Sequence, residues 1–162
     1  MMNKVFHESN FKLRIDGIIF LKNYFTNYPD IEQLTKTERF NDLYLPELLG
    51  YLEDGDQQLV CDALVATTPL LEFLEEEVIL KVFLPQLIQF FNIKSHTTQE
   101  ITEAIAANVG IIAYQLYKRK YLRDYEKDFI EFFKELINHK EVKLRLFGVY
   151  NMPCFHQLYR DQ

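Results

Sequence analysis

The residues best suited to chemistry in this sequence are Cys154 and His156, near the end of the chain. A cysteine beside a histidine could ligate a metal or act as a nucleophile with its base. Residues two apart on a helix point away from each other, however. No second Cys-x-x-Cys or His-x-x-x-His pattern completes a zinc set. We therefore expect neither a metal centre nor a reactive thiol at this pair.

The acidic turn at 53–56 is a second candidate, because Asp54-Gly55-Asp56 resembles the start of a calcium loop. A loop beginning at Asp54 would need Gly at its sixth position and Glu at its twelfth. Those positions hold Leu59 and Val65. The sequence also lacks a Gly-rich phosphate loop and a Gly-x-Ser-x-Gly motif. We therefore predict no catalytic residue, no metal, no cofactor and no enzymatic activity.

Basic side chains provide the remaining candidate contacts. The segment at 117–125, YKRKYLRDY, places cations among tyrosines and could contact an anionic ligand. It could equally be a helix C-terminus, where cations are favourable, that runs into a loop. A net charge of −6 argues against nucleic acid, so an acidic protein segment is the better partner. The predicted protein-binding residues are Lys118, Arg119, Lys120, Arg123, His139, Lys140, Lys143 and Arg145.

Two asparagines and an acidic run have structural interpretations. Asn108 lies on the apolar face of its predicted helix, so we expect its amide to bond the backbone of a neighbouring helix. Asn151 could make an equivalent contact, and either amide could instead face a partner. Three glutamates at 75–77 precede a predicted helix, where negative charge is favourable.

Composition indicates one helical domain. The 162 residues are 48% hydrophobic, which argues against disorder, and five Gly and five Pro are too few for a turn-rich β fold. No apolar run reaches the roughly 18–20 residues needed to span a bilayer. The N-terminus lacks a signal-peptide apolar region, and two distant cysteines do not suggest a disulfide framework. We expect a soluble cytoplasmic protein without membrane contact, with the nucleus as the alternative location.

Apolar periodicity predicts helices, the first of them with Asn10 as its cap. The predicted ranges are 10–25, 31–41, 43–52, 59–74, 81–91, 100–117 and a final hairpin within 127–159. The hairpin has a short polar turn at 139–141. Its first helix has an apolar face at Phe129, Phe132, Phe133 and Leu136, and its second has one at Val142, Leu146 and Val149. Such a hairpin needs neighbours to cover it.

These helices repeat one pattern. Leu-Pro occurs at 45–46 and again 39 residues later at 84–85. The second helices align at Val60, Ile101 and Val142, each 41 residues apart. Four, six and ten positions further on they carry an apolar, a small and an apolar residue: Leu64, Ile105 and Leu146; Ala66, Ala107 and Gly148; Leu70, Ile111 and Met152. The helix at 10–25 fits if Phe11 is its start. A recurring small residue lets a neighbouring helix approach closely, so we predict Val142, Leu146, Gly148 and Met152 as stacking positions.

A two-helix unit of this length, with Leu-Pro in the first helix and Val-Lys-Leu-Arg opening the last second helix, resembles a HEAT repeat. Within that family, VKLRLFGVYNMPCFHQLY at 142–159 is most similar to scaffold and regulatory subunits of type 2A and type 4 serine/threonine protein phosphatases. The features that carry this similarity are Arg145, Gly148 and the sequence Asn-Met-Pro at 151–153.

The resemblance implies an all-α superhelix, a HEAT/armadillo-like solenoid of about three and a half hairpins in a single domain, 1–162. Its units are expected at 10–28, 43–74, 80–117 and 127–159. It also implies a non-catalytic protein-binding scaffold, a phosphatase regulatory subunit or a fragment of one, with a phosphatase catalytic subunit as partner. Two alternatives stay open: another HEAT or armadillo adaptor in transport or chromosome organisation, and a small helical enzyme with a carboxylate site.

Overall fold

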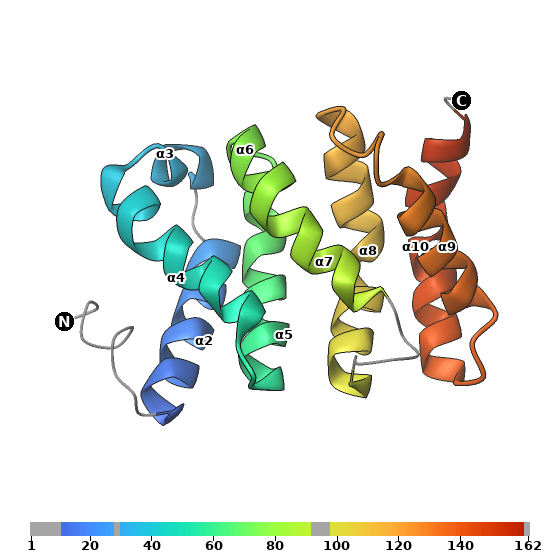
Figure 1. Ribbon diagram of the computed structural model, residues 1–162, viewed down its shortest axis with the longest axis horizontal. Helices are drawn as coiled ribbons and strands as arrows, with labels where there is room; N and C mark the ends of the chain where they lie inside the picture. The colour runs from blue at the N-terminus through green and yellow to red at the C-terminus, as the bar shows by residue number, and fades with distance from the viewer. Residues whose placement is uncertain (1–10, 28–29, 92–97, 161–162) are drawn as a thin grey trace. The chain divides into compact units, whose positions relative to one another are not determined.

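The computed structural model describes residues 11–27, 30–91 and 98–160 (Figure 1). Throughout these ranges the chain forms helices, turns and no strand, so the prediction of an all-α protein is confirmed. Asn10, the predicted cap of the first helix, lies outside the described residues. The chain divides into two compact units, residues 1–75 and 76–162.

The first unit is built around two helices that lie side by side. Helix α2 (Phe11–Asn27) packs along α5 (Gln57–Thr67), which Asp56 caps through its side chain. Between them the chain forms α3 (Ile31–Thr35) and α4 (Leu45–Gly50), and α4 also contacts α5. Short 3₁₀ turns at Tyr51–Glu53 and Thr68–Leu70 follow α4 and α5.

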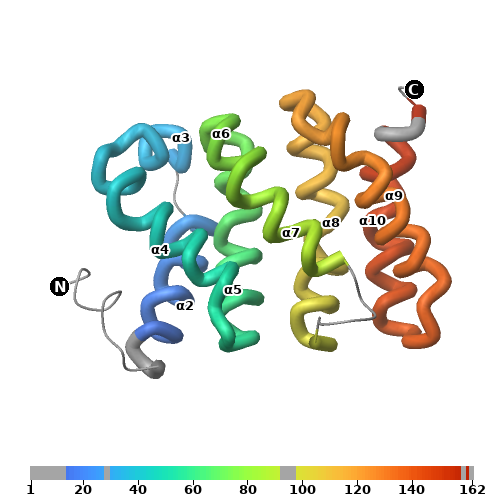
Figure 2. Tube along the Cα trace, in the orientation of Figure 1, coloured from blue at the N-terminus to red at the C-terminus, as the bar shows by residue number. Residues whose placement is uncertain are grey.

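The second unit consists of α6 (Glu76–Val78), α7 (Leu84–Phe90), α8 (Gln99–Lys118), α9 (Glu126–Ile137) and α10 (Val142–Arg160). Helices α8 and α10 lie side by side, and α9 leads from the C-terminal end of α8 back to the start of α10 (Figure 2). Glu76 and Glu77 occupy the first turn of α6, as expected for carboxylates at a helix start.

Both Leu-Pro helices begin with the same irregularity. A π-helical turn, Phe40–Tyr44 or Ile79–Phe83, leads directly into α4 or α7. The Leu45 N–H bonds the Phe40 carbonyl five residues back, and Leu84 bonds Ile79 in the same way. A proline has no N–H and its ring crowds the carbonyl four residues earlier, so a wider preceding turn accommodates it. The 39-residue repeat of the first helices therefore extends from the sequence to the backbone.

Apolar faces predicted for the first helices are buried. Leu45, Leu48, Leu49 and Leu52 are all buried, as are Leu84, Leu87 and Phe91, while Ile88 is half-buried. The predicted face of α9 is also buried, and Phe91 packs on it with ring centroids 4.9 Å from Phe129 and 4.4 Å from Phe132. These rings form the core of the second unit.

Helix α10 buries a different face from the one predicted. Val142, Leu146 and Val149 are 61, 62 and 58% exposed, whereas Leu144 and Phe155 are 2 and 1% exposed. The helix carries apolar residues on both sides, and the more regular stripe is the outward one. The predicted stacking position Met152 is exposed too, so of the four positions Gly148 alone is packed among the described residues.

Gly148 is packed for the reason expected of a small residue. A Cβ added there would lie 2.8 Å from Ile137 Cγ2 and 3.2 Å from the Ile137 backbone nitrogen. Because α9 passes this close, any larger side chain would push the two helices apart.

The register of α2 differs from the predicted alignment. Arg14 pairs with Asp54 at 2.6 Å, and Lys22 pairs with Asp62, so residues 40 apart lie side by side. Aligning Phe11 with Val60 required an offset of 49. In the second unit, Lys143 pairs with Glu103, again 40 apart, which agrees with the predicted spacing of 41 within one residue.

Candidate protein-binding surface

The predicted basic segment forms the C-terminal end of α8. Lys120 adopts a left-handed conformation (φ 63°), its N–H bonds the Tyr117 carbonyl (2.9 Å), and the Tyr121 N–H bonds the Leu116 carbonyl (2.9 Å). This is the Schellman arrangement that ends many helices. Arg119 lies over the Tyr121 ring at 4.8 Å. The segment is thus a helix C-terminus, as the structural interpretation predicts, and Lys120 and Arg123 are exposed.

The second predicted group surrounds the turn between α9 and α10. The Arg145 Nη1 donates to the carbonyls of His139 (2.7 Å) and Lys140 (2.8 Å), which lie in the turn after the C-cap Asn138 of α9. His139 Nδ1 accepts from the Glu141 backbone N–H at 3.2 Å. Lys140 is exposed, and Lys143 is held by its ion pair. Arg145 therefore closes the turn, since one guanidinium nitrogen binds two successive turn carbonyls.

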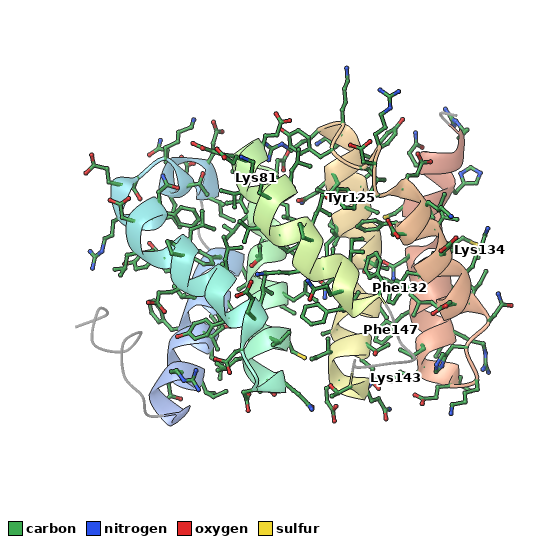
Figure 3. The ribbon with its side chains drawn as sticks, viewed as in Figure 1. Lys81, Tyr125, Phe132, Lys134, Lys143 and Phe147 are labelled. Atoms are coloured by element: carbon green, nitrogen blue, oxygen red, sulfur yellow. The ribbon has the colours of Figure 1, made fainter. Side chains whose placement is uncertain are left out.

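The structure does not bring these two groups together. Helix α8 starts beside the α9–α10 turn, where Gln99 Nε2 lies 3.3 Å from Glu141 Oε2, and it ends at the basic segment. Its 20 residues span about 30 Å at 1.5 Å per residue. In Figure 3, Tyr125 and Lys143 accordingly mark opposite ends of the second unit. The predicted residues form two separate basic surfaces.

Asp62 and Glu103 occupy equivalent places in α5 and α8. Asp62, which is 4% exposed, accepts from Gln58 Nε2 at 2.6 Å and pairs with Lys22. Glu103 accepts from Gln99 Nε2 at 3.1 Å and pairs with Lys143, a contact that lowers its pKa. Each carboxylate thus bonds a glutamine of its own helix and a lysine of the helix that packs beside it.

The acidic turn is also structural. Asp54 Oδ2 accepts from Arg14 at 2.6 Å, and its Oδ1 accepts from the Asp56 N–H at 2.9 Å. Asp56 Oδ1 in turn caps α5 by accepting from the N–H groups of Gln58 and Leu59. Among the described residues, no group of three or more His, Cys, Asp or Glu side chains is placed to hold a metal.

Cys154 and His156 both lie within α10, with Cys154 half-buried and His156 exposed. Burial raises the pKa of the Cys154 thiol, which disfavours the nucleophilic thiolate. Both cysteines are free thiols.

The buried amide that bonds a neighbouring helix is Asn151. Its Oδ1 accepts from the Gly110 N–H at 2.9 Å, and its Nδ2 donates to the carbonyls of Ala106 and Phe147, both at 2.7 Å. The prediction for Asn108 was wrong, because that side chain is half-buried and bonds Ala104 of its own helix. Gly110 precedes Asn151 by 41 residues, so the repeat period was the signal that could have paired them.

One apolar surface was missed as a candidate site. We define the outer face of α10 as Val142, Leu146, Val149, Tyr150 and Met152, all of them exposed.

In the described part of the chain, no helix is both long and apolar enough to cross a membrane. Comparison of the chain with protein-family profiles, curated proteins and solved structures finds no match.

Proposed function

We propose that this chain is a HEAT-like helical repeat protein, an α-α superhelix of about three and a half hairpins that acts as a protein-binding scaffold without catalytic activity. The agreement between the sequence period and the contacts within each unit carries this proposal. First helices repeat every 39 residues with the same π turn, and second helices pair side by side at offsets of 40 and 41. Stacked hairpins of this kind present extended surfaces to other proteins.

The specific proposal is a regulatory subunit, or a fragment of one, of a type 2A-like phosphatase, with the catalytic subunit as partner. Support comes from the resemblance at 142–159 and from what its residues do. Gly148 and Asn151 hold α10 against α9 and α8, and Lys120 and Arg123 are exposed at the end of α8. An enzyme with a carboxylate site is less well supported, because Asp62 and Glu103 are each occupied by a lysine.

Surface plasmon resonance with purified catalytic subunits tests the phosphatase proposal. We expect the immobilised chain to bind a type 2A or type 4 subunit and not a type 1 subunit. A triple variant, Lys118→Glu, Lys120→Glu and Arg123→Glu, should weaken binding at least tenfold, whereas Lys36→Glu, an exposed lysine of the first unit, should not. Absence of binding to both expected subunits would refute the phosphatase partner. Binding that the triple variant leaves intact would refute this surface.

Small-angle X-ray scattering tests the superhelix separately. A continuous stack of hairpins should scatter as one elongated body of fixed shape. A broad, concentration-independent distribution of shapes, as two units joined flexibly would give, contradicts the superhelix.

A further inference from the structure

The outer face of α10 is a continuous apolar stripe without a covering helix among the described residues. Val142, Leu146, Val149, Tyr150 and Met152 recur at helical spacing, and they are 61, 62, 58, 76 and 47% exposed. The opposite side of the same helix carries Leu144, Asn151 and Phe155, which are 1–3% exposed. Helix α10 is therefore apolar on two sides and buries one of them.

The area of this face is comparable with the largest patches on soluble monomers. If a large apolar residue exposes ~150–250 Å² when free, five residues at these exposures present on the order of 600 Å². Exposed patches of this size commonly mark interaction sites, and a standard interface buries ~800 Å² on each partner.

The positions equivalent to Val142 and Leu146 in the earlier second helices are covered. Val60 and Ile101, which correspond to Val142, are 3 and 8% exposed. Leu64 and Ile105, which correspond to Leu146, are 2 and 0% exposed. The repeat thus uses these positions for packing, and α10 presents the same positions to solvent.

Charge identifies the kind of helix that would fit. From Val142 to Arg160, α10 has no acidic residue, although the whole chain has a net charge of −6. Lys143 is paired with Glu103, but Arg145 bonds neutral carbonyls and Arg160 is exposed, so the helix keeps a positive charge. His156 and Arg160 are exposed along the helix. An occupant that places carboxylates beside its apolar stripe would meet favourable charge here.

Helix α9 shows how an amphipathic helix packs on α10. It turns its phenylalanines inward against α10 and neighbouring elements, with Phe133 stacked on Phe155 at 4.2 Å. Its exposed side carries Lys127, Glu131, Lys134 and Glu135. An amphipathic helix on the outer face would repeat the apolar part of that arrangement on the other side of α10, and the charge of α10 favours acidic flanks on it.

We propose that the outer face of α10 binds an amphipathic helix of a partner protein whose apolar stripe is flanked by Asp or Glu. The proposal rests on the protein-binding function inferred above, but it does not require the partner to be a phosphatase. Helix-in-groove recognition of this kind depends on apolar anchors at i, i+3, i+4 and i+7.

Two labelled peptides test the proposal by fluorescence anisotropy with the full chain. Both are 18-residue designed helices with the same Leu/Phe stripe; one carries Glu at the flanking positions and the other carries Lys. We expect the acidic peptide to bind at least tenfold more tightly, and less tightly as salt is raised. The variant Leu146→Glu/Val149→Glu should weaken it at least tenfold. The matched control, Ile19→Glu/Phe20→Glu on exposed apolar positions of α2, should leave binding unchanged.

Several results would overturn the proposal. These are no binding of the acidic peptide at 100 μM, equal affinity for both peptides, or equal loss in the α2 control. Light scattering provides the remaining outcome. If the chain associates with itself and the Leu146→Glu/Val149→Glu variant does not, the face binds a second copy of the chain and the proposal is wrong. Circular dichroism confirms that each variant is folded. A phosphatase subunit that binds the Leu146→Glu/Val149→Glu variant normally, together with a failed peptide test, would refute this inference and leave the phosphatase proposal standing.

Discussion

Replacing Gly110 by alanine should destabilise the protein, although the same change inside an ordinary helix is stabilising. An interior Gly→Ala substitution normally gains about 1 kcal/mol of helix stability. At Gly110 the new Cβ would lie 2.4 Å from Asn151 Oδ1, 2.9 Å from its Cβ and 3.0 Å from its Cγ. Real Cβ atoms do not approach other atoms this closely, so α8 and α10 must separate or the amide must rotate.

Either response costs more than the helix gains. Rotation of the Asn151 amide would break three hydrogen bonds worth about 1 kcal/mol each, and separation of the helices would cost about 1–3 kcal/mol. After the helix gain is subtracted, we expect Gly110→Ala to lower the free energy of unfolding by about 2 kcal/mol. That corresponds to a fall in Tm of roughly 4–8 °C for a protein of this size.

Urea unfolding followed by circular dichroism at 222 nm measures the change. Gly50→Ala is the matched control, because Gly50 has helical angles (φ −59°, ψ −33°) and no atom lies within 4 Å of its added Cβ. We expect Gly50→Ala to be neutral or to stabilise by up to about 1 kcal/mol. If Gly110→Ala stabilises as much as Gly50→Ala does, the close approach of α8 and α10 is wrong.

A double-mutant cycle locates the cause of the effect. Asn151→Gly removes the side chain that the new methyl would strike, so Gly110→Ala should become neutral or stabilising in that background. The coupling free energy should then reach about 2 kcal/mol. Additive effects of the two substitutions would show that the loss arises elsewhere.

Four further substitutions have expected signs. Lys22→Met should cost about 2 kcal/mol or more in urea unfolding, because it leaves a carboxylate that is 4% exposed without its cation. Lys143→Met should cost no more than about 1 kcal/mol, since Lys143 is 60% exposed; equal losses would contradict the role of burial. Tyr51→Phe should stabilise by about 1 kcal/mol, because the Tyr51 hydroxyl is buried without a hydrogen-bond partner in the described chain. Burial, followed by the charge of Glu47, raises the pKa of Tyr51 to about 12. The free energy of unfolding of the wild type should therefore be independent of this hydroxyl's ionisation below pH 10, and it should fall as the pH rises to 12. Unfolding curves of wild type and Tyr51→Phe should therefore diverge further across that range, and parallel curves would refute the burial of the hydroxyl. Finally, Lys120→Gly should raise Tm, because a left-handed residue other than glycine costs about 1 kcal/mol; an unchanged or lower Tm would argue against the Schellman ending of α8.

The sequence predicted the helices well because their apolar residues recur strictly. The faces at Leu45, Leu48 and Leu52 and at Phe129 and Phe132 are buried as expected, since each of these helices has one apolar side. The period of the Leu-Pro pairs also gave the spacing of the π turns, although a π turn itself has no residue signature that periodicity detects.

Apolar periodicity could not predict the contacts that depend on a single pair of atoms. Helix α10 has two apolar sides, so periodicity could not decide which one is buried, and it selected Val142 and Leu146 instead of Leu144. The choice between Asn108 and Asn151 required knowing that Gly110 leaves space for an amide. The binding residues were chosen for their charge alone, and charge does not reveal that Arg145 is committed to closing a turn.

The polar contacts between second helices suggest how their register is set. A shift of α2 by one turn along α5 would move Lys22 about 5 Å from Asp62, because one helical turn rises 5.4 Å, and would leave a buried carboxylate without its cation. A shift of α10 along α8 likewise removes Asn151 from Gly110 and strands three hydrogen bonds. We infer that burial of the leucines and phenylalanines supplies most of the stability, while these pairs, each 40 or 41 residues apart, select the register of the helices.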